Sequence, residues 1–335
     1  MTLGLSLVEH ATSGDPATAW KALTDHALAI CSAPLSKDTA TRSVTQRDRD
    51  IGKLDHFLST SGWDLWKEFP TSVESNAGAL RKWWAEPYAA KAVLILDGLS
   101  LREFPWLLQG AEAHGFTVHR KEVFGAELPA ETNEFASALG LSSRSQLQNN
   151  GGGPVHALTP SSTESVALPW LDCAKLIDSS TNWVFWHQWP DNKLHDGSGA
   201  GQGLDQLTRD VAEQLTSDDF WGFVGALAQG RRVVITSDHG YAATGLFFDA
   251  TDEQAQYLKD TFRSGRSRPG KKLEDFDVCP FVPPNALAIQ TTHGAHLLAL
   301  GRWKWRSPGG YPTLAHGGLS LLEVLCPFVE LTKQG

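Results

Sequence analysis

Acidic and imidazole side chains follow two strand-like runs of this sequence at spacings that suit metal binding. Asp238 and His239 end the run RRVVITSDHG. Asp191 and His195 follow the aromatic run NWVFWHQWP, and their Asp-x-x-x-His spacing places both on one face if a helical turn begins at Pro190. A carboxylate offers a hard oxygen and an imidazole a borderline nitrogen, a combination that suits Zn²⁺ or Mn²⁺. The two pairs therefore predict a metal centre.

Two further candidate ligands, Asp97 and His316, stand in similar positions. Asp97 ends the buried-strand pattern KAVLILDG, and ligands gather at the carboxyl ends of strands in an open parallel sheet. The competing interpretation is a turn-forming Asp-Gly pair without a chemical role. His316 opens the segment HGGLSLLEVL. Together with Asp191 and His195 it would complete a three-ligand set that leaves a position open for water or substrate, as a catalytic zinc site requires.

Three more residues compete for places in this set. His187 lies among aromatic residues in a strand-like run, which favours a packing role. His293 stands in THGAH and lacks the Gly-Gly-Leu-Ser that follows His316. Asp196 competes with Asp191, and it could instead accept the second N–H of an imidazole ligand.

The turn-rich stretch TPSSTES supplies hydroxyl groups, and a hydroxyl bound to a divalent ion loses its proton easily and becomes a nucleophile. Four of its residues are candidates: Thr159, Ser161, Ser162 and Thr163. The competing interpretation is a cap and turn cluster, which leaves room for one hydroxyl to cap while another attacks. With a hydroxyl included, the sequence predicts a two-metal phosphoryl-transfer site built from Asp97, Thr163, Asp191, His195, Asp238, His239 and His316.

The order of these groups resembles the alkaline phosphatase superfamily: an Asp, a hydroxyl residue, Asp-x-x-x-His, Ser-Asp-His-Gly and a final His. The ending His316-Gly-Gly-Leu-Ser-Leu, which leads into Pro327-Phe328-Val329, is similar to the PglZ domain of phage-defence systems such as BREX. The resemblance covers roughly residues 90 to 332.

This resemblance implies how the groups divide between two ions. Relatives place the nucleophile just before a helix in a Pro-x-x-Thr motif, which selects Thr163, and a helix start can hold phosphate oxygens on its backbone N–H groups. The implied ligands of one divalent ion are Asp97, Thr163, Asp238 and His239, and those of the other are Asp191, His195 and His316. Zinc is the leading candidate metal, with Mn²⁺ and Mg²⁺ as alternatives.

The implied activity is that of a metal-dependent phosphodiesterase or phosphatase in bacterial antiphage defence, acting on a nucleotide or nucleic-acid phosphodiester, with other defence-system proteins as partners. Thr163 would attack phosphorus, and metal-activated water would then release the phospho-threonine. We expect diesters to be preferred, because a monoester site usually needs an arginine clamp, no arginine follows Thr163 closely, and Arg102 is the one candidate. Two competing functions are an assembly component with structural metals, and a phosphomonoesterase or sulfatase acting on a small ester.

Composition limits the remaining classes of function. The chain of 335 residues suffices for one large α/β domain with a smaller appendage, and its net charge of −9 argues against general coating of nucleic acid. No apolar run approaches the length of a membrane span and no secretory pattern opens the chain, so a cytoplasmic location is expected. The four cysteines lack Cys-x-x-Cys spacing and are expected to be reduced and mostly buried. One basic run contains Arg263, Arg266, Arg268, Lys271 and Lys272. We expect this run to form a solvated loop. The less favoured interpretation is that it guides the phosphate backbone of a substrate.

The elements expected around these groups give an α/β fold. Residues 1–88 show helical apolar spacing and are expected to form a small N-terminal helical region, with packing roles for Trp63, Trp66, Trp83 and Trp84. Residues 89–335 alternate strand-like and helix-like runs, which predicts a largely parallel central sheet flanked by helices. The resemblance makes this part an alkaline-phosphatase-like, PglZ-type hydrolase domain. A hairpin is expected in ALAIQTT and HLLALG, an insertion at 243–285, and a closing helix with a Ser320–Glu323 capping box in SLLEVLCPFVEL.

Overall fold

A six-stranded sheet forms the centre of the molecule in the computed structural model, which describes residues 14–35, 39–197, 203–262, 265–306 and 311–333 together with Glu9 and Thr12. The strand order is β2-β13-β5-β1-β4-β3. The strands are β1 Lys91–Leu96, β2 Phe116–Gly125, β3 Ser162–Val166, β4 Trp183–His187, β5 Arg232–Thr236 and β13 Leu325–Lys333. Strands β5, β1, β4 and β3 pair in parallel, and β13 pairs antiparallel with both β5 and β2. The predicted α/β fold with a largely parallel central sheet flanked by helices is confirmed.

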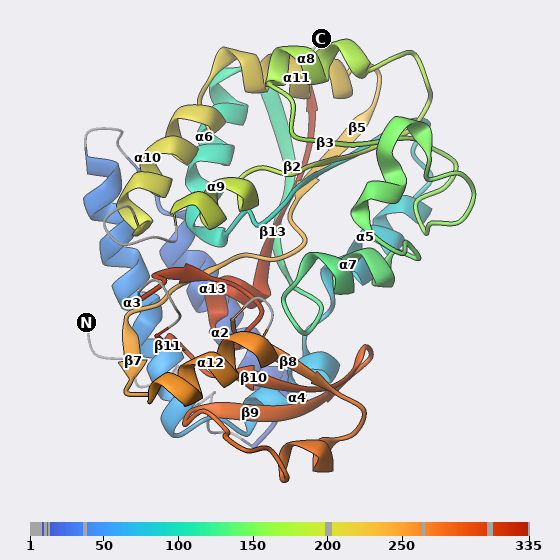
Figure 1. Ribbon diagram of the computed structural model, residues 1–335. Helices are drawn as coiled ribbons and strands as arrows, with labels where there is room; N and C mark the ends of the chain where they lie inside the picture. Colours follow the sequence, from blue (N-terminus) through green and yellow to red (C-terminus); the bar gives the residue numbers. More distant parts are fainter. Residues whose placement is uncertain are drawn as a thin grey trace.

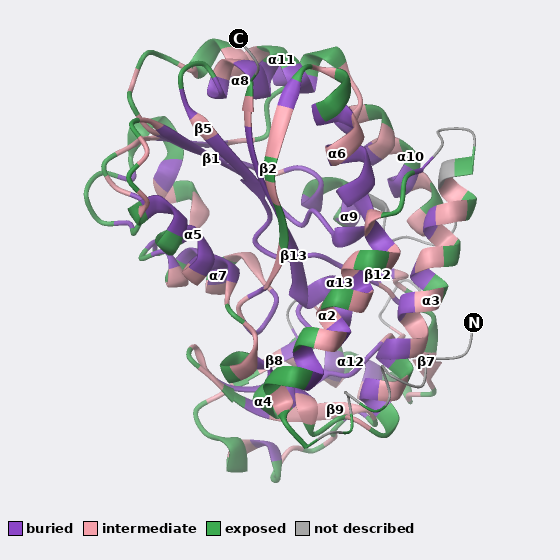
Figure 2. Cartoon of the chain, turned by 180° about the vertical axis from the view of Figure 1, so that it is seen from behind, coloured by how far each residue is buried: buried purple, intermediate pink, exposed green. Residues whose placement is uncertain are grey.

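Helices cover both faces of this sheet because its strands are apolar on both sides, as Figure 2 shows for the buried central strands. Val93 and Ile95 of β1 share one apolar core with α5 (Asn76–Ala85) and α7 (Thr132–Ala138). The alternate residues of β1 belong to the other core. That second core lies under the helices α6 Phe104–Ala113, α8 Trp170–Leu176, α10 Gly203–Leu215 and α11 Asp218–Leu227.

The N-terminal helices extend the second core. They are α2 Pro16–Ser32, α3 Ala40–Thr60 and α4 Leu65–Ser72. Trp20 and Trp66 pack ring against ring with centroids 4.9 Å apart, and both are fully buried. Trp83 and Trp84 are also buried, whereas Trp63 keeps 39% of its surface exposed beneath the ammonium group of Lys67. Packing is therefore the role of Trp66, Trp83 and Trp84.

A smaller, strand-rich lobe lies below the main sheet in Figure 1. Its three-stranded antiparallel sheet has the order β8-β10-β9, and β9 with β10 forms the expected hairpin. The elements of this lobe are β7 Leu246–Phe248, α12 Asp252–Thr261, β8 Ser267–Gly270, the 3₁₀ turn η4 Leu273–Phe276, β9 Ala286–Thr291, β10 Gly294–Ala299 and β11 Trp303–Trp305. The remaining short elements are η2 Leu101–Glu103, η3 Arg144–Asn150, α9 Asp191–Gly197, β6 Ala242–Ala243, β12 Leu314–Ala315 and α13 Leu321–Val324.

Two sequence-based assignments are wrong. The segment SLLEVLCPFVEL is one helical turn, α13, followed by strand β13, because Pro327 cannot donate to a helix and would disrupt it. Ser320 correspondingly donates its hydroxyl to the Glu323 carboxylate at 2.6 Å rather than capping a backbone N–H. The stretch TPSSTES is not a turn before a helix but contains the edge strand β3.

The burial of the cysteines agrees with the sequence-based expectation. Cys31, Cys173 and Cys326 are buried, Cys279 is half-buried, and all four are free thiols. None of the helices in the described part of the chain combines the length and apolar character needed to cross a lipid bilayer.

Candidate metal centre

Six of the seven predicted residues meet at the carboxyl ends of β1, β4 and β5. The backbone links these strand ends, because Asp97 N–H donates to the carbonyl of His187 at 3.0 Å and Asp191 N–H donates to the carbonyl of Asp97 at 2.9 Å. Asp238 lies two residues after the end of β5 and accepts a hydrogen bond from Gly98 N–H at 2.9 Å. Asp97 therefore lies at the carboxyl edge of the parallel sheet, which is the position where ligands gather in open sheets.

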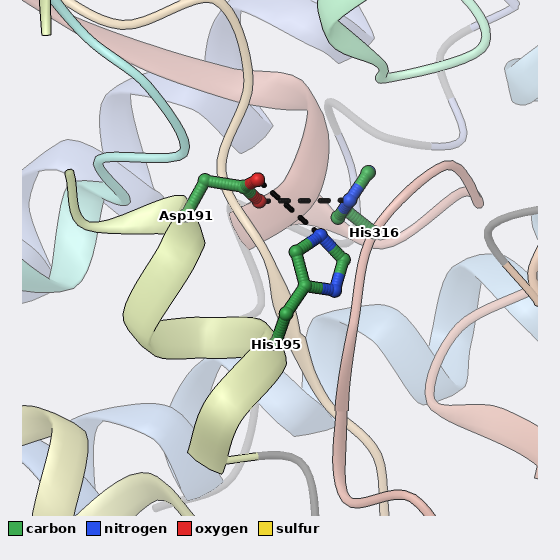
Figure 3. Close-up of side chains that lie close together, drawn as sticks. All are labelled: Asp191, His195 and His316. Carbon is green, nitrogen blue, oxygen red and sulfur yellow. Dashed lines mark ion pairs between the residues drawn. The ribbon is translucent and has the colours of Figure 1, made fainter. Parts of the chain in front are cut away.

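One group of possible ligands is formed by Asp191, His195 and His316, whose ligand atoms all lie within 4.8 Å of one another. Both aspartate oxygens face the imidazoles in Figure 3, with His195 Nε2 at 3.3 Å from Oδ2 and His316 Nε2 at 3.6 Å from Oδ1. Asp191 and His195 come from the first and second turns of α9, so the expected shared helical face exists. His195 is the exposed member, with 58% of its side-chain surface accessible.

A second group adjoins the first and consists of Asp97, Asp191 and His239, again within 4.8 Å. Asp238 extends this group, because its Oδ2 lies 3.5 Å from His239 Nε2. The rings of His239 and His316 stack with their centroids 4.3 Å apart and 20° between their planes. Asp191 belongs to both groups, so two ion positions would lie side by side.

The charges of these buried groups are strongly coupled. Burial, together with the carboxylates of Asp238 and Asp191, raises the pKa of Asp97 well above its usual value. Burial alone would lower the pKa of His239, but the same carboxylates and Asp97 raise it to about 9. Burial and the neighbouring His239 lower the pKa of His316 to about 4.

This donor set fits divalent cations. Asp97 and Asp238 are fully buried, and among the described residues neither Asp238 Oδ2 nor Asp191 Oδ1 has a hydrogen-bond partner. A buried carboxylate oxygen without a partner is costly unless a cation compensates it. Mixed oxygen and imidazole donors at this spacing suit Zn²⁺ or Mn²⁺.

Thr163 does not join the other six residues. It lies in β3 opposite Val184 of β4, which pairs with Val93 of β1, four residues before Asp97. At about 3.3 Å per residue, its backbone is on the order of 13 Å from that of Asp97 along the strands. The Thr163 hydroxyl is buried, donates to the Leu147 carbonyl at 2.9 Å and accepts from Gly152 N–H at 3.2 Å. The sequence-based choice of Thr163 as nucleophile and metal ligand is corrected by this placement.

The hydroxyl at the candidate centre belongs to Thr132, the first residue of α7. Thr132 Oγ1 donates to Asp97 Oδ1 at 3.3 Å and lies 3.3 Å from His239 Nε2. The sequence contained its signal, because Pro129-Ala-Glu-Thr132 has the same Pro-x-x-Thr spacing as Pro160-Ser-Ser-Thr163. What distinguishes them is the following segment, which is helical after Thr132 and extended after Thr163.

An arginine that sequence patterns do not single out also reaches the centre. Arg144 of η3 forms an ion pair with Asp97 Oδ2 and keeps 29% of its side-chain surface accessible. Trp186 holds the same oxygen through its indole N–H at 3.2 Å. Arg102, the expected candidate clamp, is instead buried and donates to Asp48 at 2.6 and 2.9 Å, away from the centre.

The residues that competed for ligand positions lie elsewhere. His187 is buried, its Nε2 lies 2.9 Å from the Leu168 carbonyl oxygen, and its ring packs on Trp170, in agreement with a packing role. His293 at the tip of the β9–β10 hairpin pairs with Glu127 at 3.2 Å and does not belong to either ligand group. The side chain of Asp196 lies outside the described residues.

The basic run of the smaller lobe is solvated only in part. Arg266 is fully buried in an ion pair with Glu323, and Arg268 is held by the hydroxyl of Tyr257 at 3.0 Å. Lys271 and Lys272 are exposed, and Arg263 lies outside the described residues. Among its described members, the run therefore offers two exposed lysines to a phosphate backbone.

No family model matches this sequence, and no curated protein matches it either. Among solved structures, the chain is similar to murine ectonucleotide pyrophosphatase/phosphodiesterase 5, with a TM-score of 0.48 and 13% identity over 72% of this chain and 87% of the other. An inactive variant of that protein in complex with AMP gives 0.45 and 13% over the same shares. The human protein of the same name gives 0.45 and 11%, again over 72% and 87%. The likeness to all three is one of backbone arrangement.

Proposed function

We propose that this protein is a metal-dependent phosphoric-ester hydrolase of the alkaline phosphatase superfamily, with Thr132 as its nucleophile. The observation that supports this most is the meeting of two Asp/His groups with one hydroxyl at the carboxyl edge of a parallel sheet. A purely structural metal site has no use for a half-exposed hydroxyl among its ligands or for an exposed ligand such as His195. A role as a mere assembly component therefore lacks a supporting observation.

The ligands divide between two ions by position. The ligands of the ion beside the nucleophile are Asp97, Thr132, Asp238 and His239, and those of the other ion are Asp191, His195 and His316. When bound, two divalent ions supply Lewis acidity and lower the pKa of a coordinated hydroxyl or water.

The side chains of the centre position the nucleophile and the metal ligands. The Thr132 hydroxyl oxygen lies 3.3 Å from both Asp97 Oδ1 and His239 Nε2, so an ion held by these two side chains would be within reach of that oxygen. The His239 ring is fixed in turn, because its Nδ1 lies 2.9 Å from the Gly240 carbonyl and leaves Nε2 to face the centre. In-line attack of the hydroxyl on phosphorus would form a phospho-threonine and expel an alcohol, and water would then release phosphate from Thr132.

Arg144 favours a second candidate within this class, a phosphomonoesterase. The expected preference for diesters rested on the absence of an arginine near the nucleophile, and Arg144 removes that premise. With the Asp97 carboxylate turned to an ion, the guanidinium would be released toward the substrate and could bind two non-bridging oxygens of a phosphoryl group. A diester has one negative charge fewer at that position and would gain less.

The biological setting proposed is antiphage defence, with other defence-system proteins as partners and a nucleotide or nucleic-acid ester as substrate. This proposal rests on the resemblance of His316-Gly-Gly-Leu-Ser-Leu to the PglZ domain. It predicts that disrupting the metal centre in the native host removes protection in a plaque assay. Unchanged protection after Asp238→Asn would separate the chemistry from the defence role.

The experiment that tests the hydrolase proposal combines elemental analysis with a substrate screen. We expect about two divalent ions per chain, zinc foremost, and hydrolysis of aryl phosphate esters that a chelator abolishes and zinc or manganese restores. A protein that is folded, binds no divalent ion on titration and hydrolyses neither mono- nor diesters would refute it.

A further inference from the structure

A single residue, Glu323 in α13, binds the chain segments that follow two of the candidate ligands, one through its carboxylate and one through its backbone carbonyl. After His316, Gly318 N–H donates to Glu323 Oε1 at 2.9 Å. After His239, Gly240 N–H donates to the backbone carbonyl of Glu323 at 2.8 Å. The same residue therefore fixes the turn behind each of the two stacked imidazoles, one from each ligand group.

Close packing leaves these turns little freedom. A Cβ atom at Gly240 would collide with the carbonyl oxygen of Leu322, so only glycine fits between this turn and α13. A Cβ atom at Gly318 would lie 2.6 Å from both Nε and Nη2 of Arg266. Each turn therefore packs tightly against a neighbour of Glu323, Leu322 in one case and Arg266 in the other, so a shift of α13 or of the Arg266–Glu323 pair would reach the histidines.

Glu323 is itself held by a cation from the smaller lobe. Arg266, directly before β8, donates to Glu323 Oε1 at 2.7 Å and to Oε2 at 2.9 Å, and both side chains are fully buried. Arg266 also donates to the Gly301 carbonyl at 2.6 Å, which ties the pair to the end of the three-stranded sheet. Ser320 adds a hydroxyl donor to Oε2 at 2.6 Å. With Gly318, the carboxylate accepts four hydrogen bonds and is fully compensated.

We propose that Glu323 and Arg266 are positioning residues that set the separation of His239 and His316, and so the spacing of the two metal positions. The inference rests on the proposed metal-dependent function. It assigns a task to the smaller lobe: its arginine holds the arm that bears His316, so the metal centre forms only when this lobe is folded against the sheet. The bidentate, planar fork of arginine suits this task better than an ammonium group would.

The test compares two isosteric substitutions of buried glutamates. Glu323→Gln removes the negative charge that faces Arg266 and replaces one of the two acceptor oxygens by an NH2 donor, so the four hydrogen bonds can no longer all form. Glu330→Gln is the matched control, because Glu330 is also fully buried and paired with two arginines, Arg120 at 2.9 Å and Arg232 at 2.7 Å, but lies further along β13. Both should lower the midpoint of chemical denaturation measured in the presence of a chelator.

Only Glu323→Gln should weaken metal binding. We expect a loss of about tenfold or more in zinc affinity, measured by competition with a chromophoric chelator, and an altered visible absorption spectrum of the Co²⁺-loaded protein. Arg266→Lys should lose less than Glu323→Gln, because it keeps the charge. If Glu323→Gln does not fold, Gly318→Ala replaces it, since the new methyl group would displace the Arg266 guanidinium.

Zinc binding by the wild-type protein distinguishes failure of the positioning role from failure of the proposed function. Wild-type protein that binds no zinc would refute the proposed function. Wild-type protein that binds zinc, with Glu323→Gln or Gly318→Ala matching Glu330→Gln in affinity and cobalt spectrum, would refute the positioning role alone.

Discussion

Alanine substitution of Thr132 and of Thr163 should affect different properties, catalytic turnover in the first case and folding stability in the second. Thr132 and Thr163 share the Pro-x-x-Thr spacing, but the structure gives their hydroxyls different partners. Thr132 is half-buried beside Asp97 and His239 at 3.3 Å from each. Thr163 is buried and bonded to the backbone of Leu147 and Gly152. We therefore predict that Thr132→Ala removes turnover and Thr163→Ala removes stability.

The magnitudes follow from these contacts. Loss of a nucleophile that acts as a unit with its neighbours costs at least about 10³-fold in kcat, or ~4 kcal/mol of transition-state stabilisation. The long hydrogen bond of Thr132 contributes at most about 1 kcal/mol to folding. For Thr163, truncation leaves the buried Gly152 N–H and the Leu147 carbonyl without their partner, which costs roughly 1–3 kcal/mol of unfolding free energy.

The assay measures steady-state hydrolysis of an aryl phosphate and urea denaturation for both variants at equal metal loading. Thr132→Ala should bind at least the ion held by Asp191, His195 and His316, which shows that its site is intact. The reasoning would be refuted if Thr132→Ala kept turnover within a few-fold of wild type, or if Thr163→Ala were stable but inactive. The second result would restore Thr163 as the nucleophile.

Three further predictions concern metals, substrate and pH. Asp238→Ala should lower the bound metal from two ions toward one by emptying the position beside Thr132, and His195→Ala should empty the other; loss of both ions in each variant, measured by elemental analysis, would contradict the division. Arg144→Ala should reduce kcat/KM for an aryl phosphate monoester by about tenfold or more and that for a diester much less; equal losses in matched assays would leave the arginine without a role in specificity. Burial and the neighbouring Arg266 lower the pKa of Lys304 to about 7 from 10.5. Between these values the unfolded chain binds more protons, so the contribution of Lys304 to the free energy of unfolding rises with pH, by ~5 kcal/mol over the window. Denaturation of wild type and Lys304→Met at pH 7 and 10 should show the difference between them shifting toward wild type at the higher pH, and a constant difference would refute this.

The grouping of the candidate ligands was predictable because the residues at strand ends can be recognised from the local sequence. A short apolar run followed by Asp and Gly, as at Asp97, indicates both a buried strand and the edge at which its next residue appears. The spacing of Asp191 and His195 needs only one helical turn to bring them together. These inferences depend on neighbours in sequence, so no knowledge of the tertiary structure was required.

The threonine that lies at the candidate centre was not predictable in the same way, because the same short motif occurs twice. Choosing between Thr132 and Thr163 requires the element that follows each, and the resemblance implied a helix after Thr163, where the chain forms the edge strand β3. Asn-Glu-Phe-Ala-Ser-Ala after Thr132 has better helix formers, and that difference would have favoured Thr132, the threonine that lies at the candidate centre. The closing segment was misassigned by a related error, since Pro327 lies within the supposed helix.

Sequence patterns could not predict which charged residues pair over long distances in the chain. Arg266 belongs to a run of cations that composition assigns to solvent, yet it is fully buried against Glu323, 57 residues away. The cost of burying the Arg266 guanidinium is offset by a carboxylate from another segment of the chain, and the sequence around Arg266 does not identify that carboxylate. The same is true of Arg144 and Asp97, which are 47 residues apart. A basic run should therefore be assigned to solvent only after the buried acidic residues of the fold have been given their cations.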